Sequence, residues 1–95
     1  MIPPHLDSTW QLLKRAFPNG ISEEDYLAVL DQLYPHMADE NLQNVVALFT
    51  GRDPGVVLND IFRVGSGGAV SAKVRASVGD RLCRAGFDEW VEEDD

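Results

Sequence analysis

Hydrophobic side chains recur along the chain at spacings of three and four residues, which is the period of an α-helix. The first such face consists of Trp10, Leu13 and Phe17. It predicts a helix from about residue 8 to residue 17, which Pro18 ends. Asn19-Gly20 then supplies a turn in which glycine tolerates a positive φ angle.

Residues 17–35 contain the signals of a second helix from start to end. Ser22 and Asp25 are close to a capping box, and Ile21 and Tyr26 occupy the two positions of a hydrophobic staple. The acidic first turn complements the helix dipole. The apolar face behind it consists of Tyr26, Leu27, Leu30, Leu33 and Tyr34. The polar residues of this stretch therefore indicate where a helix begins, and they do not indicate a catalytic site.

Two further helices are expected in the middle of the chain. The third opens at Asp39-Glu40 and ends at Gly51, and the fourth spans about residues 54–64 after a cap at Asp53. The apolar face of the third helix is Leu42, Val45, Val46 and Phe49. A strand is the alternative for the fourth segment, VVLNDIFRV, but the alternation of a strand fails at Asn59-Asp60, so we predict a helix.

A glycine-rich joint, GSGG at residues 65–68, precedes a fifth helix that Ser71 caps and Gly86 ends. The apolar stripe of this helix is Val74, Val78, Leu82 and Ala85. The run DEWVEEDD at residues 88–95 contains six acidic side chains and no basic one. We interpret it as a solvated tail. The predicted fold is therefore all-α, a single small bundle of four to five helices in residues 1–87 with an acidic tail.

Composition agrees with one globular domain. The chain has 95 residues, of which 44% are hydrophobic and 25% charged. The longest apolar run, Val45 to Phe49, is far shorter than the ~20 residues that span a bilayer. MIPPHLDSTW lacks the basic start and apolar stretch of a secretory signal, and Cys83 is the single cysteine. These features favour a cytoplasmic location.

The fourth helix carries more apolar surface than an edge helix needs. Its hydrophobic residues spread over roughly 160° of the helical circumference at ~100° per residue. We therefore expect this helix to lie centrally or at a subunit contact, and we predict a non-catalytic module for self-association or protein binding. The candidate contact residues are Leu48, Val57, Leu58, Ile61 and Phe62.

A small DNA- or RNA-associated regulator is the alternative. Basic side chains gather on the fifth helix, and the candidate nucleic-acid contacts are Lys73, Arg75, Arg81 and Arg84. The formal net charge of -8 opposes this function, because affinity for nucleic acid rests on neutralising phosphates. A further hypothesis is that the acidic tail folds back along Arg81 and Arg84.

The sequence offers no catalytic, metal-binding or cofactor-binding motif. Nucleophilic catalysis needs a base near Ser or Cys, and the histidines are only His5 and His36. A zinc site needs three or four converging ligands, and a calcium loop needs spaced acids around a glycine. GSGG lacks the Lys-Ser/Thr of a phosphate-binding loop. We therefore predict neither an enzyme nor a cofactor, and no small-molecule substrate is evident.

Several motifs together resemble a family of short actinobacterial proteins. They are Phe17-Pro18-Asn19-Gly20, Asp25-Tyr26, Asp39-Glu40, Asp60-Ile61, Arg81-Leu82 and Ala85-Gly86-Phe87. The family is catalogued as a domain of unknown function, found mainly in mycobacteria and rhodococci. The resemblance implies a cytoplasmic bundle of about five helices, monomeric or oligomeric, and no catalytic residues. The chain departs from the family pattern at Ala38, so we expect Asp39 to cap the third helix, and at Phe87-Asp88.

Overall fold

The computed structural model describes residues 3–67 and 70–93, and the regular secondary structure of this part is entirely helical. The α-helices are α1 (Asp7–Ala16), α2 (Glu23–Leu33), α3 (Asp39–Thr50), α4 (Pro54–Gly65), α5 (Ala72–Arg84) and α6 (Phe87–Glu93). Two short 3₁₀ helices, η1 (Pro4–Leu6) and η2 (Tyr34–His36), precede α1 and follow α2. The prediction of an all-α bundle is confirmed.

Three of the predicted helix starts, those of α2, α4 and α5, are made by the expected side chains, whereas α1 and α3 begin without a side-chain cap. The Ser22 hydroxyl accepts a hydrogen bond from the backbone N–H of Asp25, and Ser71 does the same for Val74 at the start of α5. The Asp53 carboxylate accepts from two N–H groups at the start of α4. These bonds satisfy backbone donors that have no partner within the helix.

Two glycines end helices as predicted. Gly51 follows α3 with φ 75°, and Gly86 follows α5 with φ 100°. Glycine adopts this left-handed conformation easily because it has no Cβ atom, whereas most other residues would be strained in it. The chain can therefore turn sharply after each helix.

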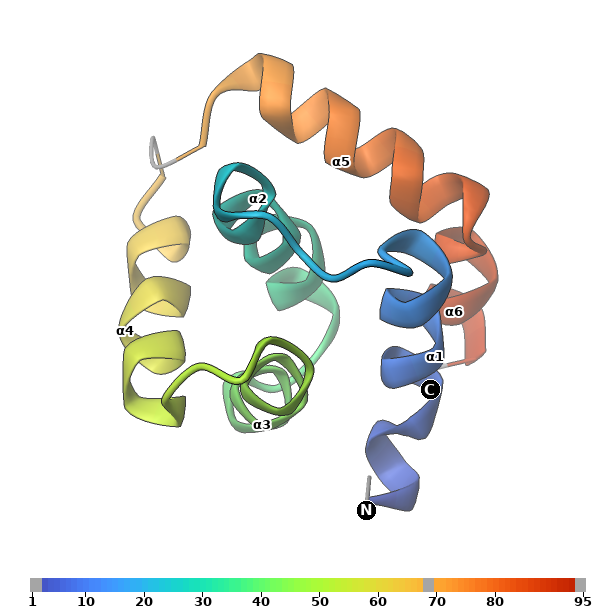
Figure 1. Cartoon of the computed structure of the whole chain (residues 1–95), viewed down its shortest axis with the longest axis horizontal. Helices are drawn as coiled ribbons and strands as arrows, with labels where there is room; N and C mark the ends of the chain where they lie inside the picture. Colours follow the sequence, from blue (N-terminus) through green and yellow to red (C-terminus); the bar gives the residue numbers. More distant parts are fainter. Residues whose placement is uncertain (1–2, 68–69, 94–95) are drawn as a thin grey trace.

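Helix α2 lies at the centre of the bundle (Figure 1), between α4 on one side and α5 on the other. Because α2 is covered on both sides, Ala28 and Val29 are completely buried together with Leu30 and Leu33. Ala28 and Val29 flank the predicted apolar stripe, so the sequence pattern underestimates how much of α2 the bundle covers.

Helix α4 occupies the outer edge of the bundle (Figure 1), where it packs against α3 and α2. Its buried side chains are Val57, Ile61 and Val64. The expectation of a central position is therefore wrong, because α2 occupies the centre and α4 turns only one face towards it.

The carboxyl end also differs from the expected solvated tail. Phe87–Glu93 forms α6, which packs against α1 and α5. The Trp90 side chain is only 2% exposed, and its indole N–H donates a 3.0 Å hydrogen bond to the Thr9 hydroxyl. The expected boundary at residue 88 thus runs through a packed helix, and residues 94 and 95 lie outside the described part.

Candidate functional site

The exposed large hydrophobic side chains of α3 and α4 are the first candidates for a contact surface. Leu48 is 51% exposed, Val56 48% and Phe62 56%, whereas Leu58 is half-buried. Val57 and Ile61 are buried in the chain's own core. Of the predicted contact residues, Leu48, Leu58 and Phe62 are therefore accessible to a partner. Val57 and Ile61 are buried and cannot contact one.

Val56 belongs to this surface although the sequence pattern did not single it out. Neighbouring residues of a helix point about 100° apart, so Val56 and Val57 do not both face the core. Val57 is completely buried, and Val56 consequently points outward. Two adjacent valines on one helix therefore indicate in the sequence that one of them is exposed.

Leu48 borders a shallow hollow of about 480 Å³ on the outside of α3. Pro3 and Pro54 contribute to its wall, and Ala47 lies in the α3 surface beside Leu48. Around Leu48, the surface is thus mainly apolar.

The charged side chains of α4 neutralise one another. Arg63 and Asp60 are the only charged residues of this helix, and they form an ion pair at 3.4 Å. Asp60 also accepts a 2.9 Å hydrogen bond from the Tyr26 hydroxyl. Helix α4 therefore presents exposed Val56 and Phe62 on an element without net charge.

The basic side chains of α5, the alternative candidates, are mostly paired within the chain. Arg75 contacts Asp31 at 2.7 Å, Arg81 contacts Asp25 at 3.5 Å, and Arg84 contacts Asp80 at 3.2 Å. Among the described residues, Lys73 has no such partner. A surface that binds nucleic acid needs cations that are free to neutralise phosphates, and here three of the four have carboxylate neighbours.

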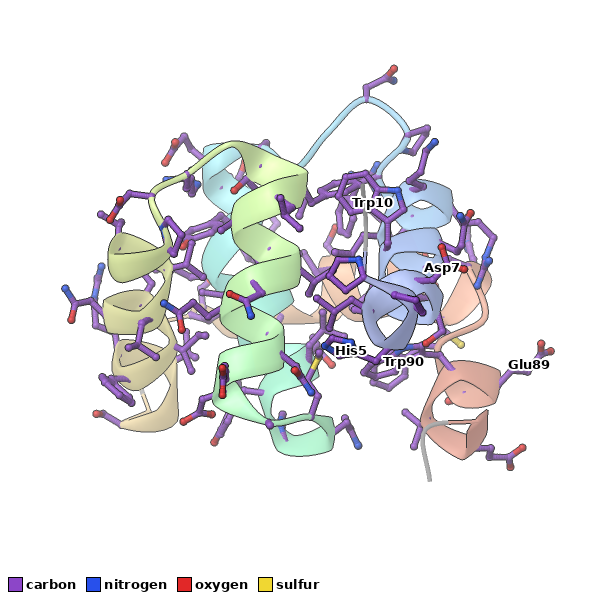
Figure 2. The ribbon with its side chains drawn as sticks, turned by 90° about the horizontal axis from the view of Figure 1, so that it is seen from below. His5, Asp7, Trp10, Glu89 and Trp90 are labelled. Carbon is purple, nitrogen blue, oxygen red and sulfur yellow. The ribbon has the colours of Figure 1, made fainter. Side chains whose placement is uncertain are left out.

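The acidic helix α6 does not pair with the arginines of α5 among the described residues. The partners of Arg81 and Arg84 are Asp25 and Asp80, not the side chains of α6. Trp90 points from α6 towards α1, and Glu89 points outward (Figure 2). The hypothesis that this segment folds back to screen Arg81 and Arg84 thus finds no ion pair in the described part of the chain.

In the described part of the chain, neither the histidines nor Cys83 belongs to a cluster of metal ligands. His36 lies edge-on to the rings of Phe87 and Trp90, at centroid distances of 5.5 and 6.2 Å. Cys83 is exposed on α5. Within residues 3–67 and 70–93, no three His, Cys, Asp or Glu side chains come together as ligands for a metal ion.

Tyr26 sits in the most connected polar cluster. The Arg52 guanidinium lies 3.9 Å from the centre of its ring and contacts Glu23 at 2.6 Å. Burial and the hydrogen bond to Asp60 raise the pKa of Tyr26 above its ordinary value. The cluster joins α2, α4 and the loop between α3 and α4, and every polar group in it is explained by that role.

No protein-family model, curated protein or solved structure matches this chain. In the part of the chain that the structure describes, every helix is too short or too polar to cross a lipid bilayer.

Proposed function

We propose that this protein is a non-catalytic interaction module that associates with a second copy of itself. The contact is the α4 surface, defined by Val56 and Phe62 on α4 and by Leu48 on α3. The observation that carries the proposal is that these large hydrophobic side chains are about half exposed on the bundle edge.

Burial of this surface supplies the driving force. Removing apolar area from water is worth about 25 cal/mol per Å². Phenylalanine is also enriched at the centres of protein contacts. A contact built on one face of a helix is smaller than the ~1,600 Å² of a standard interface, so we expect weak, concentration-dependent association.

The neutral charge of α4 permits a second copy as the partner. Two molecules that each carry a net charge of -8 repel one another at most orientations. The α4 helix adds no net charge to this repulsion, since Arg63 and Asp60 cancel. A two-fold contact brings the same neutral patch of both copies together.

The proposal is tested by light scattering on the purified full chain at concentrations from about 10 µM to about 1 mM, the range of a weak interface. We expect the mean mass to rise with concentration. Phe62→Asp places a buried charge in the contact and should weaken association by about tenfold or more.

Ser77→Asp is the matched control, because it adds the same charge at an exposed position of α5. It should leave the association unchanged, and circular dichroism checks that both variants fold. A wild-type chain that stays monomeric throughout the range, or equal effects of the two variants, would contradict the proposal.

The nucleic-acid alternative has less support. Its candidate cations Arg75, Arg81 and Arg84 already face carboxylates, and the molecule is acidic. The self-association proposal is therefore better supported, because it explains the exposed hydrophobic side chains and needs no unpaired cations.

A further inference from the structure

Three arginines meet in a hollow that the proposed α4 contact does not use. The hollow has a volume of about 310 Å³ and lies where the carboxyl ends of α1 and α5 come together (Figure 1). Its walls are Arg15, Ala16, Arg81, Arg84 and Ala85. We call it the arginine notch. It collects three of the eight basic side chains of an acidic protein.

Each guanidinium in the notch is held in place by a different contact. The Arg15 Nε–H donates a 2.7 Å hydrogen bond to the Ala85 carbonyl. Arg81 lies over the ring of Phe17, 4.6 Å from its centre. Arg84 pairs with Asp80 one helical turn away. Arg15 and Arg81 are thus restrained before a ligand binds, whereas the Arg84 side chain is 81% exposed and still has to be ordered.

The arginine notch has N–H donors left over for a ligand, and it carries a positive charge. An arginine carries five N–H donors, and the contacts just described use only a few of them. Arg15 forms no ion pair with any described carboxylate, whereas Arg81 and Arg84 face Asp25 and Asp80. Three guanidinium groups against two carboxylates leave one net positive charge in a molecule whose net charge is -8.

We propose that the arginine notch binds a single phosphate monoester group. Guanidinium forks match the oxygens of phosphate and form charge-assisted hydrogen bonds with them. Two alanines in the wall leave space between the arginines.

The surroundings of the notch limit the size of this ligand. The volume is at the small end of the range of about 300–1,000 Å³ that is usual for ligand sites. Asp25 and Asp80 stand beside the arginines, and the whole molecule is acidic. A long polyanion such as nucleic acid is repelled by the acidic surface beyond the notch. A single phosphate group instead meets the unpaired Arg15 and has to compete with Asp25 and Asp80 for Arg81 and Arg84.

A purely structural role is the rival explanation. Basic side chains near the carboxyl end of a helix stabilise its dipole and its last carbonyl groups. This explanation covers all three arginines, because Arg15 lies in the last turn of α1 and Arg81 and Arg84 lie in the last turn of α5. The two explanations differ in whether added phosphate changes anything.

The test measures thermal unfolding and calorimetric binding of the full chain with inorganic phosphate, against sodium chloride at the same ionic strength. We expect phosphate to raise the melting temperature more than chloride does, since a ligand of the folded state stabilises it. Arg15→Gln and Arg84→Gln should each weaken phosphate binding by about tenfold or more.

Arg63→Gln is the matched control, because it removes an exposed, carboxylate-paired arginine on α4. It should bind phosphate as the wild type does. Shifts of the Arg15 and Arg84 Nε–H signals in NMR spectra on adding phosphate give a readout that does not depend on stability.

Several results would overturn the proposal. The first is an equal rise of the melting temperature with phosphate and with chloride. The second is an equal loss of phosphate affinity in Arg63→Gln and in the notch variants. The third is tighter binding of a short oligonucleotide than of phosphate. Binding to vesicles that contain phosphatidic acid, lost in Arg15→Gln, would support the phosphate site and assign it to a lipid headgroup. The notch lies on α1 and α5, so its failure leaves the α4 contact untouched.

Discussion

At the residue scale, Tyr26 shows how one side chain joins separate helices. Its ring is buried, its hydroxyl donates to Asp60 of α4, and Arg52 lies over its face. Deprotonation would place a negative oxygen beside the Asp60 carboxylate. Burial first, and this carboxylate second, therefore raise the pKa of Tyr26 in the folded protein.

We predict that the stability of the protein decreases above about pH 10, the ordinary tyrosine pKa. A group whose pKa is raised by folding contributes its full stabilisation below the unfolded-state pKa and loses it as the pH rises further. Urea unfolding between about pH 8 and pH 11 measures the decrease.

Tyr26→Phe should remove part of this decrease, although it also lowers stability at neutral pH because Asp60 loses a donor. Tyr34→Phe, which keeps Tyr26, is the control and should retain the full decrease. Identical pH profiles for the wild type and Tyr26→Phe would show that Tyr26 titrates in the same way in the folded and unfolded chain.

At the element scale, α6 depends on tertiary contacts. A helix of seven residues is not stable in water by itself, and the like charges of Asp88 and Glu92 at spacing i, i+4 oppose it further. Trp90 offsets this by inserting into the core and bonding to Thr9. Trp90, with the partly buried Phe87 and Val91, therefore holds the acidic helix against the core.

We predict that Trp90→Ala lowers the free energy of unfolding by about 3–5 kcal/mol, the usual cost of removing a buried tryptophan. The Glu89 side chain on the same helix points outward (Figure 2). The control substitution Glu89→Ala should therefore change the free energy of unfolding by about 0.5 kcal/mol or less. Urea unfolding measures both variants. A loss of under about 1 kcal/mol for Trp90→Ala would mean that α6 is detached in solution.

At the scale of the whole molecule, charge and apolar surface are separated. Acidic residues dominate α2, α3 and α6, three arginines gather at the notch, and α4 is neutral. The proposed contact and the proposed phosphate site thus lie on different elements.

We predict that sodium chloride strengthens self-association. The screening length falls from about 10 Å at 0.1 M to about 3 Å at 1 M ionic strength, which weakens the repulsion between two acidic molecules. Light scattering at fixed protein concentration should show a larger mean mass at about 0.5 M than at about 0.05 M salt. Weaker association at high salt would instead indicate a contact made by ion pairs.

Three of the five long helices begin at local signals that need no tertiary contact, whereas α1 and α3 have no side-chain cap. Ser22, Asp53 and Ser71 cap their helices, and Gly51 and Gly86 end theirs, as the sequence predicts. The sixth helix was missed because the acidic residues around Trp90 dominate its pattern. Of the contact candidates, Leu48, Leu58 and Phe62 remain accessible and Val57 and Ile61 do not.

The sequence by itself thus determined approximately where the long helices lie and which residues form most of their apolar faces, because these properties depend on neighbours within one or two turns. Only the tertiary structure decided that α2 rather than α4 lies at the centre, that Trp90 belongs to the core and that Arg15 meets Arg81 and Arg84. These arrangements join residues up to 81 positions apart, as Thr9 and Trp90 are, and the spacing of residues along a helix contains no information on which helix lies beside it.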